Sequence, residues 1–187
     1  MPVSFPPISR ADARVLVLGT MPGAESLRVG QYYAHPRNAF WRIMATLFDF
    51  EPDLPYADRT RRLLAKQVAV WDVLQHCDRE GSLDQNIENE VSNDFGPFFA
   101  RHPSIHSVFF NGGNAERWCR KYAAAPATLK LKRLPSTSPT AARMNFSQKL
   151  RAWRTIRRAL GEPEPATRCV ASKYAPTTNP RSPTQLR

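Results

Sequence analysis

The sequence predicts an α/β protein, a three-layer α/β/α sandwich built around a mostly parallel sheet of about four strands. Three short apolar runs and one run of alternating apolar and basic residues are separated by segments with helical periodicity. Such alternation is typical of parallel sheets with helices on both faces. At 187 residues and 42% hydrophobic composition, the chain has room for one domain with a substantial core. We expect that domain over residues 1–161 and a flexible, Pro-rich basic tail over residues 162–187.

Three of the predicted strands are near-continuous apolar runs. Residues 13–20 (ARVLVLGT) and 68–74 (VAVWDVL) should be buried on both faces, as parallel strands are. Residues 105–113 (IHSVFFNGG) predict a third strand with a glycine-rich exit. Residues 129–134 (LKLKRL) alternate apolar and basic side chains, which predicts a fourth strand nearer an edge of the sheet.

Helices are predicted between these strands. Residues 38–48 carry apolar side chains at helical spacing, as expected of a helix that packs on a sheet. Further helices are predicted over residues 56–67, 94–102 and 114–124. A last helix is predicted after Asn145, which can cap its start. Its apolar stripe consists of Phe146, Leu150, Trp153, Ile156 and Leu160. The polar residues 75–90 are too many and too charged for a simple turn and indicate an insertion of the kind that often carries function.

The charge of the chain indicates a polyanionic partner. Lys and Arg number 27 against 16 Asp and Glu, which gives a net charge of +11 and a pI near 10.2. Such a surface should attract nucleic acid, although a merely soluble basic surface would have the same composition. The last helix has a basic face, for which nucleic-acid contact and simple solvation are both open: Lys149, Arg151, Arg154, Arg157 and Arg158.

Other features concern the cellular setting. No run of about 18 apolar residues exists to span a membrane, and the first residues, MPVSFPPISR, lack the apolar core of a signal peptide. The cysteines Cys77, Cys119 and Cys169 are odd in number and far apart, which argues against a disulfide framework and favours a reducing compartment. We expect a cytoplasmic protein, nucleoid-associated if bacterial.

Several reaction classes have no motif in this chain. The sequence has no phosphate-binding loop, no GxGxxG after the first strand, no spaced Cys and His set for zinc and no nucleophile elbow. We therefore expect no metal and no cofactor.

The unusual segments follow the strands. Parallel sheets bind ligands beyond the carboxyl ends of their strands, and polar or glycine-rich residues stand at those places: 19–23 (GTMPG), 71–77 (WDVLQHC), 110–114 (FNGGN) and 134–139 (LPSTSP). Residues 31–41 (QYYAHPRNAFW) add aromatic rings and a carboxamide. Backbone amides, aromatic rings and carboxamides beside a basic rim suit a nucleobase flipped out of a duplex.

Three of these segments resemble the uracil-DNA glycosylase superfamily, and within it the hypoxanthine-DNA (deoxyinosine) glycosylase branch. They are GTMPG after a buried strand, YYAHPRNAFW at residues 32–41 and LPSTSPTAA at residues 134–142, and the similarity spans residues 12–160. The resemblance implies a monofunctional base-excision repair enzyme that hydrolyses the N-glycosidic bond of a deaminated base. Its partner would be double-stranded DNA containing such bases, and we expect it to act as a monomer without a cofactor.

The resemblance assigns the catalytic role to Asn38. Many relatives place an Asp or Asn in the first loop, where this chain has Thr20 and Met21. In the hypoxanthine branch, an Asn of the segment matched by HPRNAFW takes the role, and its carboxamide would hold water against the sugar C1′. The alternative for Asn38 is a helix cap, because it directly precedes AFWRIM. Both roles are compatible.

The base-binding residues are expected on the same loops. Backbone amides of Gly19, Thr20 and Met21 would line the base site and stabilise the departing base. Phe40 would stack on the base, unless it is a first-turn core residue. Asp72 and Asn111 follow the second and third strands and would read the base edge, although each could instead tie down neighbouring backbone amides.

The remaining site residues are expected to contact DNA. His35 and Arg37 would meet sugar or phosphate, or are merely exposed. Ser136, Thr137 and Ser138 would bind phosphate oxygens, with Arg143 adding charge, unless this loop is an ordinary polar turn. Tyr32 and Tyr33 would wall the base site or pack beneath it. The family commonly has His or Asn before Pro-Ser, but this chain has Leu134, so no electrophilic histidine is expected there.

Three other functions stay open. A uracil- or mismatch-directed glycosylase of the same superfamily would share these segments. A non-catalytic DNA-binding module would use the same basic surface. A small-molecule nucleosidase is disfavoured, because a free nucleoside gives no reason for a net charge of +11.

Overall fold

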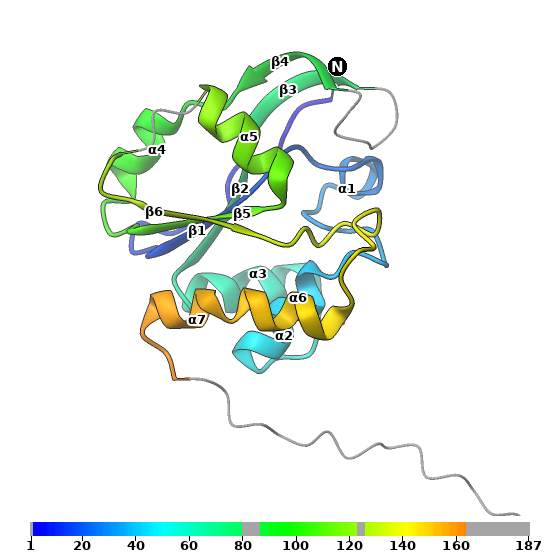
Figure 1. The fold of residues 1–187 in the computed structure, drawn as a ribbon, viewed down its shortest axis with the longest axis vertical. Helices are drawn as coiled ribbons and strands as arrows, with labels where there is room; N and C mark the ends of the chain where they lie inside the picture. The colour runs from blue at the N-terminus through cyan, green and yellow to red at the C-terminus, as the bar shows by residue number, and fades with distance from the viewer. Residues whose placement is uncertain (1, 80–86, 123–125, 164–187) are drawn as a thin grey trace, which may run out of the picture.

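The computed structural model describes residues 2–79, 87–122 and 126–163. Its centre is a parallel sheet with the strand order β2-β1-β5-β6 (Figure 1). The strands are β1 (Val15–Gly19), β2 (Val68–Asp72), β5 (Ser107–Asn111) and β6 (Lys130–Leu134). All four strands predicted from the sequence are confirmed. The predicted tail lies, beyond residue 163, outside the described residues.

The position of each strand explains its composition. Every residue of β1 and β2 is buried. β1 lies in the middle of the sheet between two helical layers, and the outer edge of β2 is covered by the N-terminal segment, where Ile8 and Val70 exchange backbone hydrogen bonds. β6 is an edge strand, and its first four residues are exposed. The register pairs Gly19 with Asp72 and Asn111 with Leu134, so the strands end together at one edge. The loops that follow them are therefore neighbours in space.

Two helical layers cover the sheet, as the predicted three-layer sandwich requires (Figure 1). One layer consists of α2 (Phe40–Phe48), α3 (Tyr56–Ala65), α6 (Phe146–Trp153) and α7 (Thr155–Leu160). The other consists of α4 (Phe95–Arg101) and α5 (Gly113–Tyr122). The short helix α1 (Ala24–Val29), which the sequence analysis did not predict, lies on the loop after β1 and ends at Gly30 in the left-handed conformation.

The last predicted helix consists of two helices, α6 and α7, that meet at Arg154. The cap prediction is confirmed, because Asn145 accepts a hydrogen bond from Gln148 N and the Gln148 side chain accepts one from Asn145 N. The basic face is not a uniformly solvated surface. Lys149 is buried, and Arg157 donates hydrogen bonds to the carbonyl oxygens of Leu47 and Pro163.

The polar residues 75–90, predicted as an insertion after β2, include parts of two strands. The strands are β3 (Leu74–Arg79) and β4 (Ile87–Ser92), which pair antiparallel, and residues 80–86 lie outside the described residues. This strand pair begins directly after β2, at the edge where the parallel strands end. Val73 N donates to Gly19 O there, and Leu74 N donates to Thr20 O. Apolar side chains are sparse in the pair, since mainly Leu74, Cys77 and Ile87 are buried, and so the sequence lacked the pattern that predicts strands.

Within the described part of the chain, no helix has the length and apolar character needed to cross a membrane. Cys77 and Cys119 are buried and form no disulfide within the described residues, and burial raises the pKa of the Cys119 thiol to about 11. Cys169 lies outside the described residues.

Candidate active site at the carboxyl edge of the sheet

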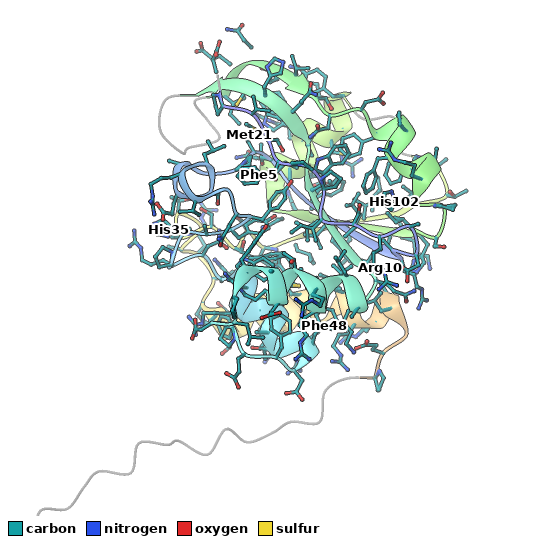
Figure 2. The ribbon with its side chains drawn as sticks, turned by 180° about the vertical axis from the view of Figure 1, so that it is seen from behind. Phe5, Arg10, Met21, His35, Phe48 and His102 are labelled. Atoms are coloured by element: carbon teal, nitrogen blue, oxygen red, sulfur yellow. The ribbon has the colours of Figure 1, made fainter. Side chains whose placement is uncertain are left out.

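A cleft of about 740 Å³ opens at the edge where the parallel strands end. Its volume lies in the range of sites for small ligands and bases. The loops after β1, β2, β5 and β6 form its walls, together with α1 and the segment before α2. Of the residues selected from the sequence, these line it: Gly19, Thr20, Met21, His35, Arg37, Asn38, Asp72, Asn111, Ser136, Thr137 and Ser138. Figure 2 places His35 at the edge of the molecule, beside α1.

Asn38 lies at the start of α2 and lines the cleft. Its Oδ1 accepts a hydrogen bond of 2.9 Å from Phe40 N, and its own N–H donates to His35 O over 2.8 Å. The bond from Phe40 identifies Oδ1 as the acceptor and so fixes the orientation of the carboxamide. The N-cap residue of α2 is Ala39, so Asn38 is not the helix cap that its position suggested; it stands one residue earlier, and its side chain accepts from the first N–H of the helix. Within the described residues, the amide NH2 of Asn38 makes no hydrogen bond, so it and the second lone pair of Oδ1 can act on a ligand or a water molecule.

The aromatic residues that line the cleft are Tyr32 and Tyr33, and not Phe40. Phe40 is 0% exposed and does not line the cleft. The Tyr33 ring stacks on it at a centroid distance of 4.0 Å and an interplanar angle of 25°. Tyr33 has a φ of 56°, a conformation uncommon for a bulky residue, and this backbone places its ring there. The prediction that Phe40 stacks directly on a base is thus not supported, because Tyr33 covers it.

Tyr32 is buried and also lines the cleft. Its backbone N–H donates to the Tyr56 hydroxyl, its own hydroxyl donates to Phe5 O, and its carbonyl accepts from Trp41 Nε1. Burial raises the pKa of the Tyr32 phenol, and the charge of nearby Asp72 raises it further. The phenol therefore stays a neutral donor that fixes the floor of the site.

Asp72 presents a buried carboxylate at the end of β2. It is 2% exposed and lines the cleft. Gly19, its register partner on β1, is necessary for this arrangement. A Cβ at Gly19 would collide with Asp72 Oδ1 and lie 3.0 Å from the Tyr33 hydroxyl. The absence of a side chain at Gly19 therefore lets an acidic group and an aromatic ring converge on the end of β1.

Asn111 holds the loop after β6 in place. Its Nδ2 donates to Thr137 Oγ1 over 2.9 Å, and its Oδ1 accepts from Thr137 N over 2.8 Å. Gly112 has a φ of 101°, and a Cβ there would lie 2.9 Å from the Cβ of Ser136. Ala39 N donates to Thr137 O, which joins this loop to the start of α2. The backbone-tying role considered for Asn111 is thus present, and base reading by Asn111 stays a prediction.

Comparison with known proteins identifies the family. Residues 6–160 match the family model described as the uracil DNA glycosylase superfamily. The chain belongs to this superfamily. The resemblance stated from the three loop segments is therefore confirmed.

Two curated relatives of this glycosylase-superfamily chain are named hypoxanthine DNA glycosylases. The protein from Methanosarcina barkeri is 35% identical over 109 residues, which cover 58% of this chain and 69% of the relative. The protein from Methanosarcina acetivorans is 34% identical over 112 residues, which cover 59% and 71%.

A solved structure is similar over most of this superfamily member. It is a solution NMR structure of a Methanosarcina acetivorans protein provisionally named a uracil DNA glycosylase. The two share 30% identity and a TM-score of 0.68, over 82% of this chain and 97% of the other. The predicted glycosylase-like α/β fold is confirmed.

The rim of the glycosylase cleft carries polar and basic groups. His35 Nδ1 accepts a hydrogen bond from Arg37 N over 3.1 Å, and Arg37 is exposed. Ser138 and Thr140 join their hydroxyls over 2.8 Å. Arg143 does not line the cleft, because the loop carries it into a neighbouring recess. Of the other predicted DNA-contacting residues, only Ser136 lines this recess as well as the cleft.

Four polar residues that line the cleft were not predicted from the sequence: Glu25, Ser26, Asn114 and Thr140. Ser26 is buried in α1, and its Oγ accepts a hydrogen bond from Ala34 N. Asn114 stands in the first turn of α5, directly after the glycine-rich exit of β5. The position of Asn114 in the segment FNGGN, after a predicted strand, could have indicated it from the sequence. Ser26 could not have been predicted in this way, because α1 is too short to show helical periodicity. Among the described residues, no three His, Cys, Asp or Glu side chains gather as a metal site requires.

Proposed function

We propose that this glycosylase removes hypoxanthine from deoxyinosine in double-stranded DNA, as a monomer and by hydrolysis of the N-glycosidic bond. The observation that carries the proposal is Asn38, whose fixed carboxamide lines a cleft of about 740 Å³ beside an aromatic ring and a buried carboxylate. The two hypoxanthine DNA glycosylases named above support the choice of base. The net charge of +11 supports a polyanionic substrate.

The flipped base would lie against Tyr33. A base and an aromatic ring stack independently of base identity, so this contact holds the base without selecting it. Selection falls to Asp72. Hypoxanthine presents a lactam N1–H, from which a carboxylate accepts a hydrogen bond, whereas adenine has only a lone pair at N1 and would be repelled. The carboxylate therefore favours a deaminated purine over the normal base.

Bond cleavage would follow from the position of Asn38. The C1′–N9 bond breaks with its electron pair going to the base, and the sugar acquires oxocarbenium character. Water held by the Asn38 carboxamide then forms the new C1′–O bond and loses a proton to solvent. Backbone amides near Thr20 and Met21 stabilise the negative charge on the departing base. An amide suffices for this step, because the cationic sugar needs an aligned water molecule more than a strong base.

The test is cleavage of a labelled duplex with one inosine, followed by alkali to break the abasic strand. Parallel duplexes carry xanthine, uracil or adenine, and free deoxyinosine serves as a small-molecule control. We expect abasic product from the inosine duplex, little from adenine and none from the free nucleoside. Absence of product from inosine would contradict the proposal. Preferential cleavage of uracil, whose N3–H can also donate to Asp72, would favour a uracil-directed enzyme instead.

A further inference from the structure

A second recess of about 250 Å³ adjoins the candidate active site. Ser136, Thr140 and Ala141 line both the cleft and this recess, so the loop after β6 forms a wall between them. The rest of the recess lining is Pro135, Ala142, Arg143, Met144 and Lys149. Two of these residues are cationic and none is acidic.

Lys149 is the unusual residue of this recess. It is only 7% exposed, and its ammonium group makes no hydrogen bond or ion pair with any residue in the described part of the chain. Buried lysines are nearly always paired, because burial of an uncompensated charge is costly. Burial accordingly lowers the pKa of Lys149, and no acidic group offsets that effect. A cation held in this way lacks an anionic partner.

The helix that carries Lys149 does not need the lysine for its own folding. The capping box of Asn145 and Gln148 already satisfies the start of α6. Trp153, one turn further along, packs in the core and donates its indole N–H to Pro135 O over 2.9 Å. This bond holds α6 against the loop that walls the recess. The helix therefore positions Lys149 rigidly beneath the loop.

We propose that this recess binds a backbone phosphate of the DNA strand that carries the flipped nucleotide, with Lys149 as its main cationic ligand. Arg143 adds a second positive charge, and the hydroxyls of Ser136 and Thr140 supply donors. A strand whose base enters the cleft must cross the shared loop, which brings a neighbouring phosphate over the recess. The inference rests on DNA being the substrate, but it does not depend on which base is removed.

The first test compares the salt dependence of DNA binding for wild type, Lys149→Gln and Lys130→Gln. The ligand is a duplex with a tetrahydrofuran abasic-site analogue, which has no base to remove, so this result is separate from the test for hypoxanthine removal. Lys130→Gln is the matched control, because it removes the same charge from the exposed start of β6, at the sheet edge opposite the cleft. We expect Lys149→Gln to lower the salt slope by about one and to weaken binding about tenfold. Equal slopes for the two variants would overturn the proposal.

The second test locates the phosphate. Neutral methylphosphonate linkages replace single phosphates on either side of the abasic analogue, and binding is measured for wild type and Lys149→Gln. At one position, the neutral linkage should weaken binding by wild type and leave binding by Lys149→Gln unchanged, which is the signature of a direct contact in a double-mutant cycle. The same loss in both proteins at every position would contradict the assignment. A different outcome would be that inorganic phosphate stabilises wild type and not Lys149→Gln, with no coupling between Lys149 and any DNA phosphate. That result would indicate a site for free phosphate and would also overturn the assignment.

A third measurement separates binding from a role in folding. Lys149→Met keeps the aliphatic length of the side chain and removes the unpaired buried charge. We expect this variant to melt at the same or a higher temperature than wild type while it binds the abasic duplex more weakly. A lower melting temperature with unchanged DNA binding would show that Lys149 serves the fold.

Discussion

The ring of Tyr33 lies face to face on the ring of Phe40, with centroids 4.0 Å apart, and of the two only Tyr33 lines the cleft. The two rings therefore have different roles, one in the core and one at the cleft. Phe40 fills the core at the start of α2, where it also meets Trp41 and Trp153 edge-on. Tyr33 covers that core and presents an aromatic face to a ligand.

Loss of the Tyr33 ring should weaken excision more than folding. We choose Tyr33→Asn, because asparagine tolerates the positive φ of 56° at this position. Stacking of a base on an aromatic ring contributes about 1–3 kcal/mol, so kcat/KM for an inosine duplex should fall about 5- to 150-fold. Tyr33→Phe keeps the ring and should stay close to wild type. Equal activity of Tyr33→Asn and wild type would exclude Tyr33 from base binding.

Truncation of Phe40 should act on stability. Phe40 is fully buried among aromatic rings, so Phe40→Ala leaves a cavity and should lower the free energy of unfolding by about 3–5 kcal/mol. Phe40→Leu fills most of the space and should cost about 1.5 kcal/mol or less. Chemical denaturation measures both values. An unchanged denaturation midpoint for Phe40→Ala would contradict the packing described for α2.

Two substitutions of Asn38 should separate catalysis from the hydrogen bond that its side chain accepts at the start of α2. Asn38→Ser retains an oxygen that can accept the hydrogen bond from Phe40 N, whereas Asn38→Ala does not. Both should lower kcat for inosine removal by about 10²- to 10⁴-fold, because neither carries a carboxamide to hold water. Only Asn38→Ala should also lose about 1 kcal/mol of stability. An active Asn38→Ser would remove the amide from the mechanism.

A methyl group at Gly19 should disrupt the cleft. The added Cβ would collide with the Asp72 carboxylate and crowd the Tyr33 hydroxyl, so at least one of these groups must move. We expect Gly19→Ala to lower both excision and the melting temperature. Gly96→Ala is the control, because its Cβ would meet only the Asp94 side chain, at 3.3 Å, at the start of α4. Excision by Gly96→Ala should match wild type, and a normal rate for Gly19→Ala would refute the steric argument.

Neutralisation of Asp72 should weaken base selection. Asp72→Asn keeps the size of the side chain but removes the charge that accepts the lactam N–H. A hydrogen bond to a charged group contributes about 1.5–3 kcal/mol, so inosine excision should fall about 10- to 100-fold. Excision of adenine should not fall in parallel, because its N1 is no longer repelled. A parallel loss on both duplexes would assign Asp72 to the structure of the cleft and not to selection.

The sequence determined the layered fold and the general location of the site. Apolar runs mark strands buried on both faces, and apolar stripes mark helices that cover them, because burial imposes the same periodicity on any chain with this fold. The loops GTMPG, HPRNAFW and LPSTSP were informative for a related reason. Parallel strands end at one edge of the sheet, so residues far apart in the chain could be assigned to one site before their contacts were known.

Only the tertiary structure decided which groups in those loops reach a ligand. Tyr33 and Phe40 are both aromatic residues next to the same helix, and their order relative to the cleft depends on one positive φ at Tyr33. From the sequence, Lys149 is one of several cations on a helix face that could be solvated. In the structure, the bond from Trp153 to Pro135 holds α6 against the loop after β6, and Lys149 is buried there. The spacing of apolar residues in a sequence indicates which face of a helix or strand is buried on average. Exposure of a single side chain depends on segments that pack against it from elsewhere in the chain, which no local pattern encodes.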